Sequence, residues 1–200
     1  MKPGARSTLG DVAVAAGDAL RRAGIRAVLT GGACAHLHSR GAHLSHDADF
    51  VLVEPCAIEE LDRALADLGF RRERDRYVHP RAPFVVEFPR GPLGIGEDRR
   101  IRPVWLRRRG ARTLGLSATD SCRDRLAAFY HWGDRQSLAV AVAIARRNRI
   151  SMVKVRAWSR SEGQLEGYEV FREELARARR RRLRTRSPRQ SRPTSRPARR

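Results

Sequence analysis

The sequence contains few cysteines, few aromatic residues and no long apolar run. Among its 200 residues are three cysteines, an odd number, and they lie far apart at Cys34, Cys56 and Cys122. This spacing argues against a disulfide framework or a zinc knuckle and is typical of reduced thiols in a cytoplasm. No stretch approaches the roughly 20 apolar residues of a membrane span. No cleavage pattern follows the short apolar N-terminal segment, so we expect a cytoplasmic protein without a signal peptide.

Acidic residues are absent from residues 176–200, a segment that holds 12 of the chain's 42 Lys and Arg residues. The whole chain carries a net charge of +20. Beyond Leu183, Ser, Pro and Arg dominate, and such a composition cannot bury enough apolar surface to offset its ordering entropy. We therefore predict a disordered basic tail at 184–200. It can contact RNA through phosphates, or it can be a solvated extension without a specific partner.

Hydrophobic periodicity and turn residues predict the order of the secondary-structure elements. Helices are expected at 7–23, 33–39, 57–69, 119–147, 151–162 and 165–182, and strands at 26–32, 46–55, 71–79 and 84–89, with edge strands at 101–108 and 112–117. Strands alternate with helices in the first part, and the last part is all helical. This order predicts a small α/β or α+β core over residues 1–118, followed by a helical section over 119–183.

Two aspartates stand one residue apart at the start of the strand predicted at 46–55. Because side chains alternate along a strand, Asp47 and Asp49 share one face, about 6–7 Å apart, and repel each other unless water, arginines or a divalent cation neutralise them. A third acid, Glu87, lies between apolar residues of a later strand. If the two strands are neighbours, the three carboxylates form a site for one or two metal ions that bridge nucleotide phosphates. The alternative is a set of solvated carboxylates at a strand entrance.

A glycine pair precedes the aspartates. Gly31 and Gly32 end a strand and open a short helix, where backbone N–H groups can approach a phosphate without obstruction by side chains. Arg40 and Ser45 lie between the glycines and the acids, and both are available to hold phosphate oxygens. The ordered combination of Gly-Gly, Asp-x-Asp and a later apolar–Glu–apolar strand is more specific than any of its parts.

This combination resembles the polymerase-beta-like nucleotidyltransferase superfamily, in particular its small bacterial members of the abortive-infection and toxin type. The resemblance covers roughly residues 8–175 and implies an α+β fold in which helices flank a small mixed sheet. It implies Mg²⁺ held by Asp47, Asp49 and Glu87, and transfer of NMP from an NTP to an acceptor hydroxyl. It also implies a toxin-like role with an antitoxin partner, and the high positive charge favours RNA as the acceptor.

In the resembling nucleotidyltransferases, a basic residue on the helix that follows the core reaches the triphosphate. Arg123 or Arg125 is in the position to do this here. The alternative is that both arginines pair with Asp120, Asp124 or Asp134 on the protein surface. The spacing of Arg125 and His131 also resembles the Arg…His motif of helical-bundle RNases.

Four of the six histidines cluster at His36, His38, His43 and His46. Histidine is a common ligand of transition metals, but residues two apart do not share a helix face and no cysteine pair supports a zinc site. We interpret these histidines as exposed or substrate-facing loop residues, and the glycine-rich stretch at 91–98 as a flexible loop near the site. A non-catalytic RNA- or partner-binding protein on a degenerate nucleotidyltransferase fold is the alternative function.

Overall fold

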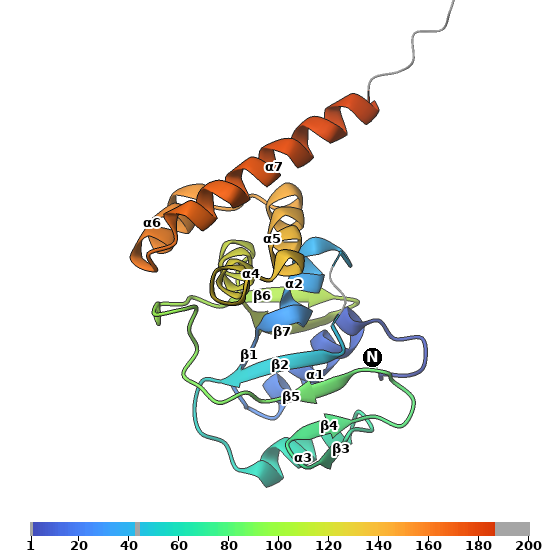
Figure 1. Ribbon diagram of the computed structural model, residues 1–200. Helices are drawn as coiled ribbons and strands as arrows, with labels where there is room; N and C mark the ends of the chain where they lie inside the picture. Colours follow the sequence, from blue (N-terminus) through green and yellow to red (C-terminus); the bar gives the residue numbers. More distant parts are fainter. Residues whose placement is uncertain (1, 43–44, 187–200) are drawn as a thin grey trace, which may run out of the picture.

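A computed structural model of the protein describes residues 2–42 and 45–186, with side chains up to residue 181 (Figure 1). Helices and strands alternate in the first part, and four helices follow within the described chain. The elements are α1 (Leu9–Arg22), β1 (Ala27–Leu29), α2 (Gly31–Ser39), β2 (Asp47–Leu52), α3 (Ile58–Ala66), β3 (Arg71–Glu73), β4 (Arg76–Val78), β5 (Val85–Glu87), β6 (Val104–Arg108), β7 (Ala111–Gly115), α4 (Ala118–Trp132), α5 (Arg135–Arg147), α6 (Met152–Ser161) and α7 (Leu165–Arg186).

The strands of the described chain form one seven-stranded sheet in the order β3-β4-β5-β2-β1-β7-β6. Strand β2 pairs with β5 in parallel, β1 pairs with β7 in parallel, and the remaining pairs are antiparallel. The predicted α+β fold with a mixed sheet is therefore confirmed. The prediction of two edge strands is correct for β6 but wrong for β7, which is covered by a strand on each side.

Helix α1 shows how the sequence positions the elements around the sheet. Its N-cap is Thr8, one residue after the predicted start, and Thr8 and Asp11 form a reciprocal capping box. The helix lies against β1, β2 and β7, where a Cβ at Gly17 would collide with the side chain of Thr113. The buried carboxylate of Asp11 also accepts a 2.6 Å bond from Arg108, which ties the helix to β6.

Two predicted elements are interrupted by residues with positive φ. The strand predicted at 71–79 is a hairpin of β3 and β4, and it turns at Arg74 with a φ of 59°. The helix predicted at 119–147 ends at Gly133, whose φ is 65°, and restarts after Asp134. The carboxylate of Asp134 accepts hydrogen bonds from the first backbone N–H groups of α5, so two helices replace one.

One hydrophobic cluster runs from the sheet into the C-terminal helices as far as Phe171 and Leu175 of α7. The C-terminal part of α7 then extends away from the other elements (Figure 1). The helix includes Arg184, where the basic tail is predicted to begin, and residues 187–200 lie outside the described residues. In the part of the chain that is described, no helix has the length and apolar character needed to cross a membrane.

Candidate active site

Three carboxylates converge where β2 and β5 lie side by side. The parallel register places Asp47 opposite Val85 and Asp49 opposite Glu87. Side-chain alternation sends Ala48 to the buried side of β2, so both aspartates lie on the other face. One oxygen from each of Asp47, Asp49 and Glu87 lies within 4.8 Å of the others. The structure thus brings together the three acids that the sequence analysis selected.

The carboxylates repel one another, and this repulsion is visible at the central residue. Burial, and then the neighbouring charges of Asp47, Glu87 and Asp124, raise the pKa of Asp49 to about 6, while Arg125 opposes the increase. A divalent cation between the carboxylates would neutralise the repulsion. Three half-buried carboxylates supply only oxygen ligands, and this donor set fits a hard cation such as Mg²⁺.

The glycine pair opens α2 directly beside the acids. Gly31 has a φ of 57°, and a Cβ at this position would collide with the carboxylate of Asp49. The backbone N–H of Thr30 donates a 2.9 Å bond to the carbonyl of Asp49, which fixes the start of α2 against β2. Within the described chain, the Thr30 side chain makes no capping bond. The N–H groups of Gly31 and Gly32 at this helix end are therefore suited to an anionic ligand.

Ser45 and Arg40 have different relations to the cluster. The Ser45 hydroxyl donates a hydrogen bond to Asp47, so it orients a carboxylate of the site. Arg40 is exposed and ends α2 in a left-handed conformation with a φ of 54°. At a rise of 1.5 Å per residue, it lies about 13 Å from Gly31 along the helix. The described residues include no ion pair of Arg40, and its contact with phosphate remains a prediction.

The two arginines of α4 lie on different sides of the helix. Residues two apart are separated by about 200° around a helix axis. Arg123 is buried and pairs with Asp98 at 2.6 Å and Asp120 at 2.9 Å. Its guanidinium also lies 5.1 Å from the ring centre of Trp158. These contacts hold Arg123 against α6, so its predicted contact with a triphosphate has no support from the geometry.

Arg125 interacts electrostatically with the acid cluster. It pairs with Asp124 at 2.7 Å, as the surface-pairing alternative predicts. Unlike Arg123, it lies close enough to Asp49 to oppose the increase in the pKa of that carboxyl group. The contact of Arg125 with a triphosphate stays a prediction.

Two charged residues near the cluster were missed by the sequence analysis. Asp124 contributes to the raised pKa of Asp49, although the sequence suggested it only as a partner for arginines. Arg76 on β4 is the cross-strand neighbour of Glu87, and cross-strand neighbours share a face of the sheet. No sequence pattern marks either residue, because their positions depend on the phase of α4 and on the β4–β5 register.

One of the clustered histidines has a structural partner. The Nε2 atom of His38 lies 2.9 Å from the carbonyl oxygen of Leu116, and burial lowers the pKa of His38. Among the residues that the structure describes, no group of three potential metal ligands contains a histidine, and His43 lies outside them. A zinc site built on the histidines thus has no support in the described residues.

The RNase-like pair of Arg125 and His131 is not assembled. Arg125 pairs with Asp124, whereas the Nε2 atom of His131 lies 3.9 Å from a carboxylate oxygen of Glu162 on the α6 side. The glycine-rich loop at 91–98 is attached to the same side. Its Glu97 N–H donates to Glu162, and its Ile95 carbonyl accepts a bond from Trp158. The loop predicted to be flexible is thus held against α6, and its place near the site stays a prediction.

Comparison with known proteins supports the assignment of the fold. No protein-family model and no curated protein sequence matches this chain. Among solved structures, the chain is similar to an antigenic nucleotidyltransferase-like protein from Paracoccidioides brasiliensis, with a TM-score of 0.53 and 17% sequence identity. The match covers 72% of this chain and 78% of that chain. The nucleotidyltransferase-like fold implied by the sequence is confirmed, and membership of a toxin-type subgroup stays a prediction.

Proposed function

We propose that the protein is a nucleotidyltransferase that transfers NMP from an NTP to an acceptor hydroxyl. The observation that carries the proposal is the convergence of Asp47, Asp49 and Glu87, whose carboxylate oxygens lie within 4.8 Å of one another. The backbone at Gly31, placed directly beside Asp49, supplies a binding point for phosphate. The fold shared with a nucleotidyltransferase-like protein supports the same reaction class.

The reaction needs little covalent chemistry from the protein. The acceptor oxygen forms a bond to the α-phosphorus of the NTP, the bond from this phosphorus to the β-phosphate oxygen breaks, and pyrophosphate leaves. The proton of the acceptor hydroxyl passes to solvent. Mg²⁺ bound by Asp47, Asp49 and Glu87 would supply charge neutralisation at the phosphates and activation of the hydroxyl.

The residues around the acids position the nucleotide. The N–H groups at the start of α2 bind a phosphate of the triphosphate, and Ser45 holds the Asp47 carboxylate in place. Arg125 and Arg76 supply positive charge on two sides of the cluster, from α4 and from β4 respectively. Catalysis then rests on orientation and on stabilisation of charge in the transition state.

A labelling experiment tests the proposal. The full chain is incubated with each of the four α-labelled NTPs, Mg²⁺ and bulk cellular RNA. We expect transfer of label that falls by roughly a hundredfold or more in Asp49→Asn, because a lost metal ligand removes several kcal/mol of transition-state stabilisation. The control is Asp67→Asn, which removes the same charge from an exposed position at the end of α3.

Two results contradict the proposal. Equal transfer by the parent and by Asp49→Asn would show that the acid cluster does not catalyse the reaction. Absence of transfer with all four NTPs and several acceptors, while RNA is retained, would favour the non-catalytic RNA-binding alternative. Chelation of divalent cations by EDTA should also stop transfer, and added Mg²⁺ should restore it.

The toxin-like role is a finer part of the same proposal and rests on the sequence resemblance. We expect production of the parent protein to slow the growth of a bacterial host, and production of Asp49→Asn to leave growth unchanged. An antitoxin partner would then be a protein that restores growth when it is produced together with the parent. Equal growth of both strains would remove the toxin role and leave the transferase reaction in place.

A further inference from the structure

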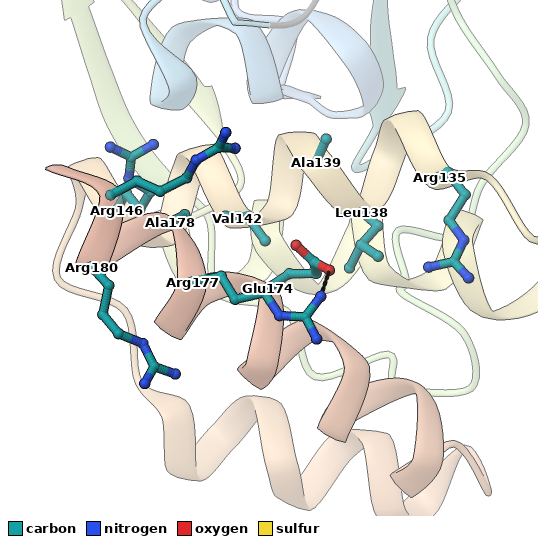
Figure 2. A pocket seen from close by; sticks show the side chains of 10 residues that line it. Arg135, Leu138, Ala139, Val142, Arg146, Glu174, Arg177, Ala178 and Arg180 are labelled. Carbon is teal, nitrogen blue, oxygen red and sulfur yellow. Dashed lines mark hydrogen bonds and ion pairs between the residues drawn. The ribbon is translucent and has the colours of Figure 1, made fainter.

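A basic groove lies between α5 and α7, on the helical part of the molecule. Its volume is about 940 Å³, and Figure 2 shows it between the two helices. Leu138 and Val142 of α5 and Ala178 of α7 form its apolar floor. Arg135 stands at one end of the groove, and Arg146 and Arg180 stand towards the other end (Figure 2).

The groove carries much more positive than negative charge. Five arginines line it, against a single acid, Glu174. Glu174 is already paired with Arg177 at 3.0 Å. Within the part of the chain whose side chains are described, Arg146 and Arg180 have no ion pair or hydrogen bond from their guanidinium groups. Two exposed, uncompensated guanidinium groups beside an apolar floor are suited to the phosphates of an anionic chain.

The length of the groove suits a chain of phosphates better than a single one. Arg135 and Arg146 are both on α5, and a rise of 1.5 Å per residue separates them by about 16 Å along the helix axis. The guanidinium of Arg135 lies 5.5 Å from the ring centre of Phe129, which fixes its position at the start of α5. A small anion would contact one end of this groove, whereas a polynucleotide can contact both.

An exposed aromatic residue precedes the groove. Trp132, the last residue of α4, is 80% exposed, so the core gains little from this large side chain. Its Cα lies at most about 11 Å from that of Arg135, because consecutive Cα atoms are 3.8 Å apart. A basic groove with an aromatic side chain at its end is the usual combination in proteins that bind single-stranded nucleic acids, since unpaired bases stack on the ring.

Helix α4 connects this end of the groove with the acid cluster. It packs against α2, whose first residue Gly31 lies beside Asp49, and against α5, which forms one wall of the groove. Along α4, Arg125 lies about 10 Å before Trp132.

We propose that the α5–α7 groove binds single-stranded RNA, with Arg146 and Arg180 on its phosphates and Trp132 stacked on a base at the Arg135 end. The RNA is the acceptor, and its terminal hydroxyl is directed along α4 towards Asp47, Asp49 and Glu87. RNA is the proposed ligand of the groove because proteins recognise RNA mainly at single-stranded segments, whose bases stack on aromatic side chains. The binding step stands on the groove alone, whereas the use of the RNA as acceptor rests on the proposed function.

Fluorescence anisotropy with the full chain and a labelled single-stranded RNA of about 16 nucleotides tests the proposal. The double variant Arg146→Gln/Arg180→Gln should bind roughly tenfold to thirtyfold more weakly at 0.1 M salt. The slope of log affinity against log salt should fall by about 1.4, for two lost phosphate contacts. Both arginines are exposed, and an unchanged thermal unfolding midpoint shows that the variant is folded.

The matched control is Arg22→Gln/Arg63→Gln. These two arginines line a different cavity, of about 420 Å³, between α1 and α3. Helices α1 and α3 lie on the sheet side of the molecule, away from α5 and α7 (Figure 1). The control removes the same charge and should change RNA affinity by less than about twofold. Equal losses in the two double variants would overturn the groove as a binding site.

Trp132 supplies an independent test of the stacking contact. Trp132→Ala should weaken binding of single-stranded RNA by roughly fivefold or more, and Trp132→Phe should restore most of the loss. Neither substitution should change the affinity for duplex DNA, whose bases are already stacked. The parent should bind the RNA more tightly than duplex DNA and more tightly than single-stranded DNA. If it binds either DNA as tightly as the RNA, the assignment to single-stranded RNA is overturned.

The binding and transferase proposals fail in different ways. Asp49→Asn should bind RNA like the parent. One outcome is that RNA binding depends on the groove but neither the parent nor any variant transfers label. This outcome would contradict the proposed function and keep the groove as an RNA site. Transfer to RNA that is unaffected by the groove and Trp132 variants would keep the transferase and overturn this inference.

Discussion

Gly31 determines both the backbone conformation at the start of α2 and the space available to the Asp49 carboxylate. Its φ of 57° belongs to the left-handed region, which glycine enters without steric cost. The absence of a side chain also leaves room for the Asp49 carboxylate, which lies where a Cβ would be. The glycine therefore serves two purposes, because it allows α2 to start at this point and it leaves room for the acidic side chains on this face of β2.

We predict that Gly31→Ala reduces NMP transfer by about a hundredfold, because the added methyl group displaces the Asp49 carboxylate and small misplacements at a reacting centre are costly. Gly24→Ala is the control, since Gly24 has a φ of 81° and a Cβ there would meet nothing within 4 Å. Both variants should lose about 1–2 kcal/mol of unfolding free energy from backbone strain. Transfer rates measured at equal folded fractions separate the loss of stability from the displacement of the Asp49 carboxylate. Equal transfer rates for Gly31→Ala and Gly24→Ala would contradict the prediction.

At the residue scale, the sequence predicted those parts of the site that depend on local geometry. Strand alternation is enough to place Asp47 and Asp49 on one face. The position of Glu87 depends on a β2–β5 register that no local pattern specifies. The sequence analysis could therefore include Glu87 only as an acid between apolar residues of a later strand, on the condition that the two strands are neighbours. Asp124 and Arg76 were missed because they approach the acids through tertiary packing, from α4 and β4.

At the scale of elements, the rotation of α4 about its axis decides which arginine can serve the site. One side of the helix directs Arg123 towards Asp98 and Trp158, which anchors the 91–98 loop and α6 to the core. Another side brings Arg125 towards Asp49. The sequence analysis could not choose between the two arginines, because the low amphipathicity of this helix does not define its phase. The contacts of Arg123 give it a stabilising position, and a site role of Arg125 stays a prediction.

Substitution of each arginine by glutamine should therefore have a different effect. Arg123→Gln leaves Asp98 and Asp120 without their buried partner and should lower the unfolding free energy by about 3 kcal/mol. Arg125→Gln leaves one aspartate unpaired instead of two, so it should lower the unfolding free energy by less than Arg123→Gln does, and it should reduce kcat/KM for the NTP by about tenfold. Urea unfolding and steady-state kinetics on both variants provide the measurement. Loss of transfer in a fully stable Arg123→Gln would reverse the two assignments.

The element boundaries that the sequence analysis missed are places where a single residue changes the direction of the chain. Gly133 adopts a φ of 65° and divides the predicted helix, although Gly within a long helical pattern is also tolerated. Arg74 adopts a φ of 59° in a hairpin turn, a conformation that its residue type does not indicate. The central position of β7 follows from its pairing with β1, between residues far apart in the sequence.

At the scale of the whole molecule, charges of opposite sign are separated. The acids lie on the sheet, at the start of β2 and the end of β5, and the basic groove lies on α5 and α7. The positive region attracts a polyanion over distances of about a Debye length, and the acidic region remains available for cations. If both proposals hold, this separation would let one molecule bind an RNA strand and a metal-bound nucleotide without competition between the two sites.

The last prediction concerns deletion of residues 187–200, the part of the predicted basic tail that follows α7. The deletion separates the contribution of this segment to RNA binding from that of the groove. This segment contains five arginines and no acid, and it follows α7, one wall of the groove. The deletion should weaken RNA binding and lower the salt slope by up to about 3.5, at about 0.7 for each lost phosphate contact. The shortened protein should still prefer single-stranded RNA to duplex DNA, and this preference should still depend on Trp132. Anisotropy titrations at several salt concentrations measure both effects, and complete loss of RNA binding in the shortened protein would show that the tail, and not the groove, holds the RNA.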